Sequence, residues 1–101
     1  MQDDGRWAPA WITQNNPIYQ GPVEIRGIMV TPKSDKRTTV TLRHGLGSGD
    51  PVAGIIQADT GASNHLLFGA PVLFDRGLYV GVDGDVVGVL LIWRPYIPPD
   101  R

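Results

Sequence analysis

The sequence predicts an all-β protein, either an antiparallel β-sandwich of the jelly-roll kind or a small barrel, with about six to seven short strands. Three observations favour this fold class. Apolar and polar residues alternate with a period of two through much of residues 23–94, as in strands with one buried face. Thirteen glycines and nine prolines lie between the apolar runs, where such residues form turns. No segment carries the spacing of an amphipathic helix.

The first strand is expected at Val23–Val30, because apolar residues recur there at every second position. One face would carry Val23, Ile25, Gly27 and Met29, and the other Glu24, Arg26 and Ile28. Pro32 ends this strand because proline has no N–H to donate to a ladder. The residues KSDKR (33–37) form a charged turn.

The middle of the chain predicts three more strand segments. Thr38–His44 alternates strictly, with Val40 and Leu42 pointing inward. Its outward residues would be Thr39, Thr41 and Arg43. The glycine loop GLGSGDP (45–51) separates it from a short strand at Val52–Ala58. His65–Phe74 is apolar but contains a glycine and a proline, so we expect a bent strand or two short ones.

The last two strands are expected at Gly77–Val82 and Val86–Trp93. They flank Asp83-Gly84, a dipeptide that favours a tight hairpin turn. Residues 1–22 show neither helical nor strand periodicity and predict an extended N-terminal arm. Residues 95–101 predict a proline-rich C-terminal tail that does not continue a ladder, so residues 23–94 form the domain.

Composition excludes several classes of function. The formal net charge is -1, which gives little attraction to nucleic acid or to an anionic membrane, so neither is expected as a partner. The chain has no cysteine, which excludes disulfides and thiolate metal sites. The longest apolar run, Val86–Trp93, is too short to cross a bilayer. The segment MQDDGRW lacks the features of a signal peptide.

The segment QADTGASN (57–64) contains Asp59-Thr60-Gly61, the active-site triplet of aspartic proteases. Such a subunit has two large apolar residues before the aspartate, whereas this chain has Gln57-Ala58. Only residues 62–101 follow the triplet, too few for the flap, brace and dimer strand of that family. The reaction also needs a braced pair of carboxylates. We therefore interpret the triplet as a turn and predict no catalytic residue.

No cofactor or metal site is predicted either. The loop GLGSGDP (45–51) is followed by a proline and a strand, whereas a phosphate loop needs the N-terminus of a helix. The residues DGD (83–85) lack the other ligands of a calcium loop. His44 and His65 have no second His or Glu at ligand spacing.

The segment VVGVLLIW (86–93) is apolar on both faces of the strand that it predicts. One face would carry Val86, Gly88, Leu90 and Ile92, and the other Val87, Val89, Leu91 and Trp93. One set is expected in the core, and the other against a partner subunit or the N-terminal arm. The alternation leaves open which set is inside.

Four segments carry a resemblance to a known family. In order they are GIMV (27–30), TTVTLRHGLGSGDP (38–51), LLFGAPVLFDRGLYV (66–80) and DGDVVGVLLIW (83–93). This order resembles small all-β virion proteins of tailed bacteriophages, met as head decoration (cement) or head and tail accessory proteins. The resemblance spans residues 23–94. It implies a non-enzymatic subunit on the capsid surface, assembled in the host cytoplasm, that bridges major capsid proteins as a homotrimer.

The side chains expected to contact a partner are large and mostly aromatic, because tryptophan and tyrosine dominate interface energetics. They are Trp7, Trp11, Ile12, Ile18, Tyr19, Leu91, Trp93 and Tyr96. Two other functions stay open. One is a neck or tail adaptor, or the base of a fibre. The other is a carbohydrate-binding module that uses exposed tryptophan and tyrosine.

Overall fold

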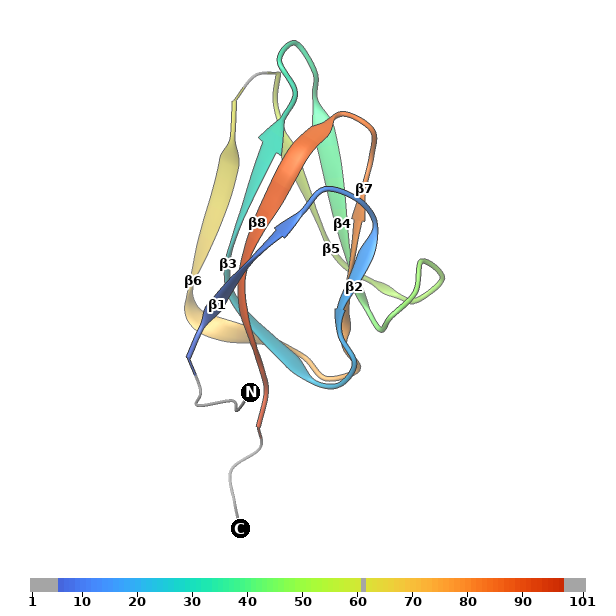
Figure 1. The fold of residues 1–101 in the computed structure, drawn as a ribbon, viewed down its shortest axis with the longest axis vertical. Helices are drawn as coiled ribbons and strands as arrows, with labels where there is room; N and C mark the ends of the chain where they lie inside the picture. Colours follow the sequence, from blue (N-terminus) through green and yellow to red (C-terminus); the bar gives the residue numbers. More distant parts are fainter. Residues whose placement is uncertain (1–5, 61, 98–101) are drawn as a thin grey trace.

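The protein is a sandwich of two β-sheets, seen in a computed structural model that describes residues 6–60 and 62–97 (Figure 1). Within these residues eight strands form two four-stranded antiparallel sheets. The strands are β1 (Ala8–Ile12), β2 (Asn16–Tyr19), β3 (Val23–Pro32), β4 (Thr38–His44), β5 (Val52–Ala58), β6 (Asn64–Phe74), β7 (Leu78–Val82) and β8 (Val86–Pro95). The predicted all-β sandwich is confirmed, and the eight described strands do not close into a barrel.

The strand order is β1-β8-β3-β6 in one sheet, called sheet A here, and β2-β7-β4-β5 in the other, sheet B. Only β4 and β5 pair with a neighbour in the sequence. Three further pairs are nested around them, β3 with β6, β2 with β7 and β1 with β8. β3 also pairs with β8, and β4 with β7, which completes each sheet. The chain therefore folds back on itself at the loop 45–51, and the resulting double ribbon wraps into two layers.

The core lies between the sheets and takes one face of each strand. Val40 and Leu42 point into it from β4, as predicted, and Thr39 and Thr41 stay half-buried on the other face. The largest fully buried side chains are Val23, Ile25, Val30, Thr38, Val40, Leu78, Val80, Val89 and Leu91. Burying an aliphatic side chain of this size contributes about 1.5–3 kcal/mol.

In β3 the predicted face assignment is wrong beyond Ile25. The register shifts between Ile25 and Gly27 against both neighbouring strands, which is the mark of a bulge. The shift exchanges the two faces, so that Ile28 is buried and Met29 is turned to the outside of the sheet. Arg26 lies at the shift and is exposed.

Residues 8–19 are not an extended arm, because they supply one edge strand to each sheet. β1 pairs with β8 along its whole length, and β2 pairs with β7. Pro9 and Pro17 conceal the strand pattern in the sequence, but an edge strand tolerates a missing N–H. Residues 1–5 of the predicted arm lie outside the described residues.

The other end of the chain also pairs further than predicted. β8 continues to Pro95, opposite Val23, and the Tyr96 N–H then donates to the Pro22 carbonyl at 2.9 Å. Residues 98–101 of the predicted tail lie outside the described residues. The segment 65–74 belongs to one strand, β6, so the first of the two predicted alternatives is the one observed. Its pairing with β3 is irregular, because the register jumps from Leu67 to Val72.

The predicted hairpin at Asp83-Gly84 is wrong, because β7 lies in sheet B and β8 in sheet A. Asp83 instead ties this connection to the start of β4. Its carboxylate accepts hydrogen bonds from the Thr38 hydroxyl, from the Thr39 N–H at 3.0 Å and from the Asp85 N–H at 3.0 Å. A short polar residue that binds nearby backbone groups suits such a turn.

These contacts predict a pH-dependent stability. Burial alone would raise the pKa of Asp83, but the hydrogen bonds from Thr38, Thr39 and Asp85 outweigh it and hold the pKa below its ordinary value of 3.8. The stabilisation is therefore complete above pH 3.8 and is lost as the pH falls through the lower, folded-state pKa.

We expect Asp83→Asn to lower the free energy of unfolding by about 1 kcal/mol at neutral pH, because an amide accepts fewer of these hydrogen bonds. Urea unfolding of both proteins measures the difference. The difference should shrink at acid pH, below 3.8 and through the lower folded-state pKa, where the native carboxyl takes up a proton. An equal difference at both pH values would contradict this role of the carboxylate.

Candidate functional site

The outer face of sheet A is apolar across all four strands. One row of paired residues crosses the sheet as Trp11, Leu90, Met29 and His65, from β1 to β6. The next row includes Ile92 and Leu67 on either side of Gly27. Together with Leu73, the large apolar side chains of these rows form what we call the apolar face. It consists of Trp11, Met29, Leu67, Leu73, Leu90 and Ile92.

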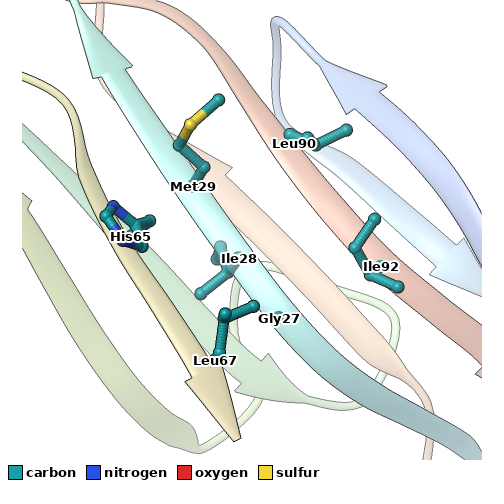
Figure 2. Close-up of a pocket in the computed structure, with 7 residues that line it drawn as sticks. All are labelled: Gly27, Ile28, Met29, His65, Leu67, Leu90 and Ile92. Atoms are coloured by element: carbon teal, nitrogen blue, oxygen red, sulfur yellow. The ribbon is translucent and has the colours of Figure 1, made fainter.

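Much of the apolar face is open to solvent. Leu67 is 80% exposed, Trp11 54% and Leu73 42%, whereas Met29, Leu90 and Ile92 are half-buried. Figure 2 shows Met29 on β3, Leu90 and Ile92 on β8, and Leu67 and His65 on β6 around one groove. The groove holds about 200 Å³. Contiguous exposed apolar surface of this kind marks interaction sites on soluble proteins.

Two glycines shape this surface by leaving room for larger neighbours. A Cβ on Gly27 would come 2.9 Å from Leu67 Cδ2 and 3.3 Å from the Leu66 carbonyl oxygen, so Gly27 forms the floor of the groove. A Cβ on Gly88 would come 2.0 Å from Trp11 Cζ2. The indole of Trp11 therefore lies flat against β8.

Charged and polar groups border the apolar face at its two ends. At one end Arg94 Nε donates to Glu24 Oε1 at 3.0 Å, and the Arg94 guanidinium lies 4.2 Å from the Trp7 ring centroid. The Arg26 guanidinium lies 5.7 Å from the same ring. At the other end the Thr31 and Ser63 hydroxyl oxygens are 3.3 Å apart. An apolar centre with a polar rim is the usual anatomy of a protein interface.

The outer face of sheet B differs, because polar side chains cover its central strands. They surround a shallow hollow lined in part by Thr39, Thr41, Tyr79 and Arg43. Several polar groups here already hold the fold together. Arg43 Nη1 donates to the Asp50 carbonyl at 2.8 Å, and Asn15 Oδ1 accepts from the Val82 N–H at 2.8 Å. The outer face of sheet B is therefore polar along its central strands β4 and β7, although Ile55 and Val52 are exposed on its edge strand β5.

Two of the predicted partner contacts lie in the core. Ile12 is 4% exposed and Leu91 is fully buried, since both pair with neighbours whose side chains point between the sheets. Such side chains have no surface to offer a partner, so neither residue belongs to the candidate site. Trp7 and Trp11 do lie at the apolar face, as its rim and its largest member.

The other four predicted contacts gather at the end of the sandwich where the chain enters and leaves. Ile18 and Trp93 pack against the core, and the Tyr19 ring lies 5.7 Å from the Trp93 ring. Tyr96 is half-buried and anchored to Pro22. These residues close the gap between the sheets and are separate from the apolar face.

The structure identifies the inner set of the last strand. Val89 and Leu91 are buried and Trp93 packs on the core, while Leu90 and Ile92 belong to the apolar face. A register shift between Thr31 and Pro32 breaks the alternation at the start of β8. As a result Val86 is buried, whereas Val87 is 47% exposed.

Three members of the apolar face were not predicted by single-strand patterns, namely Met29, Leu67 and Leu73. Met29 appears on the opposite face in the sequence because the bulge in β3 is invisible there. The signal that was available is the segment HLLFGAPVLF (65–74), which is strongly apolar and has no Asp, Glu, Lys or Arg. A segment of this kind, once it lies at a sheet edge, exposes apolar side chains.

The Asp59 triplet lies at the turn between β5 and β6, and its Gly61 is outside the described residues. The Asp59 side chain is 82% exposed and forms an ion pair with Arg37, at 3.2 Å between Oδ1 and Nε. This differs from the buried, braced carboxylates that aspartic proteases require. The loop 45–51 is held by Asp50, whose Oδ2 accepts from the N–H groups of Leu46 and Gly47 at 3.0 Å each.

The described part of the chain has no group of three or more Asp, Glu or His side chains placed to hold a metal ion. Over the same residues, no helix is long and apolar enough to span a membrane. Comparison with models of known protein families finds no match for this chain, and comparison with curated proteins finds none either.

The two faces of β8 predict opposite outcomes for neighbouring substitutions. Leu91→Glu should prevent folding, because it buries a carboxylate among aliphatic side chains. Leu90→Glu should fold, since its side chain points to the solvent side of sheet A. Circular dichroism and urea unfolding distinguish the two variants. If both variants fold with similar stability, or if only Leu91→Glu does, the assigned inner set is wrong.

Asp59→Asn should change the free energy of unfolding by no more than about 1 kcal/mol, because exposed ion pairs contribute little. Thermal unfolding measures this, and Arg37→Gln is the matched control for loss of the same pair. The two variants should behave alike. A proteolytic activity of the native protein that Asp59→Asn abolishes would contradict the interpretation of the triplet as a turn.

Proposed function

We propose that this protein is a non-enzymatic structural protein that docks onto a protein assembly through the apolar face of sheet A. The observation that carries the proposal is the contrast between the two outer faces. The apolar face of sheet A continues across its central strands β3 and β8, through Met29, Leu90 and Ile92. The central strands of sheet B, β4 and β7, instead present threonines, a tyrosine and an arginine. Burying the apolar face against a partner supplies roughly 25 cal/mol per Å² before the costs of association.

We further propose that the sandwich is a jelly roll. The nested pairing of β1 with β8, β2 with β7, β3 with β6 and β4 with β5 supports this, because a jelly roll is a folded double ribbon of eight strands. Jelly rolls are frequent in viral capsid and lectin domains. Fold alone does not determine function, so this support is limited to the architecture.

The assembly we propose is the head of a tailed bacteriophage, with the major capsid protein as partner. This part of the proposal depends on the resemblance of residues 23–94 to virion proteins. In it the protein is a decoration or cement subunit on the capsid surface. A neck or tail adaptor would use the same apolar face, and copy number per virion separates the two. Hundreds of copies support decoration, whereas six or twelve would support the tail.

The test is the binding of purified variants to capsids that lack the protein. Leu90→Glu should weaken binding by roughly a hundredfold or more, because it places an unpaired charge in the middle of the buried face. Co-sedimentation with capsids measures the bound fraction.

Thr41→Glu is the matched control, since it places the same charge on the outer face of sheet B. It should bind as the native protein does. If Leu90→Glu binds normally, or if Thr41→Glu loses binding to the same extent, the apolar face is not the docking site. If the native protein binds no capsid, the phage assignment fails while the folding results above are unaffected.

A further inference from the structure

One side of the sandwich has edge strands that are long and carry no charged side chain. At the opposite side β1 and β2 have five and four residues, and each contains a proline. β5 and β6 have seven and eleven residues and no charged side chain. Proteins normally protect exposed edges with short strands, prolines or charges. β6 has one such protection, Pro71, and its edge in sheet A is open to an added strand on either side of that residue (Figure 1).

The side chains of β6 are also exposed where an added strand would contact them. Leu67 is 80% exposed, Leu73 42% and Leu66 41%. Leu67 and Leu73 lie on the outer face of the sheet, opposite Gly27 and Glu24. Leu66 lies on the inner face, opposite the buried Ile28, so both faces of this edge have apolar side chains without full cover.

The sequence of β6 is self-complementary about its Ala70. Stepping outward from Ala70, Phe68 matches Val72, Leu67 matches Leu73 and Leu66 matches Phe74. In each matched pair the two residues lie on the same side of the sheet. Leu67 and Leu73 pair with outer-face positions of β3, and Leu66 and Phe74 with inner-face positions. Phe68 and Val72 both pack against the core. No charge repels a second copy anywhere along the strand.

We propose that β6 pairs antiparallel with β6 of a second copy of this chain, around a two-fold axis at Ala70. Leu67 then lies opposite the partner's Leu73 on the outer face, and Leu66 lies opposite the partner's Phe74 on the inner face. The interface is isologous, as in most homodimers. Backbone N–H and C=O groups of the two free edges satisfy one another.

Pro71 is compatible with this pairing. It supplies no N–H, so the ladder has a gap beside the axis and depends on the residues on either side. Its partner in this register is Gly69, and a Cβ built on Gly69 has no heavy atom within 4 Å. The open space at Gly69 accommodates the proline ring of the other copy.

The pairing joins two sheets into one continuous sheet with four strands from each copy. An axis that relates two antiparallel strands in this way stands perpendicular to the sheet, so both apolar faces are on the same side. The dimer presents twice the apolar surface of one chain. The inference itself does not depend on the proposed function, and it replaces the homotrimer implied by the family resemblance with a two-fold dimer.

Sedimentation equilibrium of the full chain tests the oligomeric state. The native protein should form dimers, and Leu67→Lys should raise the dimer dissociation constant by at least about tenfold, because it places a charge at two contacts of each dimer. Val87→Lys is the control, since Val87 is exposed on β8, away from the β6 edge. It should dimerise normally. A native monomer or trimer, or a Leu67→Lys protein that dimerises fully, would overturn the proposal.

A charge pair tests the register. Leu67→Lys combined with Leu73→Glu should recover dimerisation, because each lysine then meets a glutamate of the other copy. Leu67→Lys combined with Leu73→Lys should remain monomeric. If the two double variants have equal dissociation constants, the register is wrong.

A single cysteine tests the axis, since the chain has none of its own. Paired Cα atoms in an antiparallel ladder are about 4.5–5.5 Å apart, within the range of a disulfide. Ala70→Cys should form a covalent dimer on mild oxidation, and Ala8→Cys on β1 should not. Equal crosslinking of the two variants, or none at Ala70→Cys, would exclude the axis at Ala70.

Discussion

The pairing of β3 with β8 in the middle of sheet A is the interaction on which the rest of the structure depends. Both strands have ten residues, and they pair from Val23 opposite Pro95 to Pro32 opposite Val86. Their inner side chains form one wall of the core. Since successive side chains of a strand point to opposite sides, the same two apolar strands also produce an apolar outer surface. Met29, Leu90 and Ile92 lie on this outer surface because neither strand alternates strictly between apolar and polar residues.

The nested order of the strands explains why local patterns located the strands but not their partners. Six strands, β3 to β8, lie close to where alternation and turn residues predict them. The Asp83-Gly84 turn has the composition of a hairpin, yet it crosses between sheets because β8 pairs with β3 and β1 instead. β1 and β2 were missed because Pro9 and Pro17 are acceptable only at edges, and edge position depends on the whole topology.

The candidate site was predictable only in outline. A last strand that is apolar on both faces indicated a second apolar surface, and Trp11 lies beside it in the structure, opposite Leu90. Which of Leu90 and Leu91 points into the core is decided by the register of β8 against β3. The bulge after Ile25 places Met29 on the outer face of the sheet, opposite to the predicted one. The exposure of Leu67 depends on the position of β6 at the edge of sheet A. These features arise from pairing between distant segments, which single-strand periodicity does not contain.

We propose that the apolar face of sheet A is the docking surface. Hydroxyl-radical footprinting tests it most directly, because reactive side chains lie on both outer faces: Trp11 and Met29 on sheet A, and Tyr79 on sheet B. Comparison of the free protein with the capsid-bound protein should show protection of Trp11 and Met29 and unchanged oxidation of Tyr79. Protection of Tyr79 with unchanged oxidation of Trp11 and Met29 would contradict the claim.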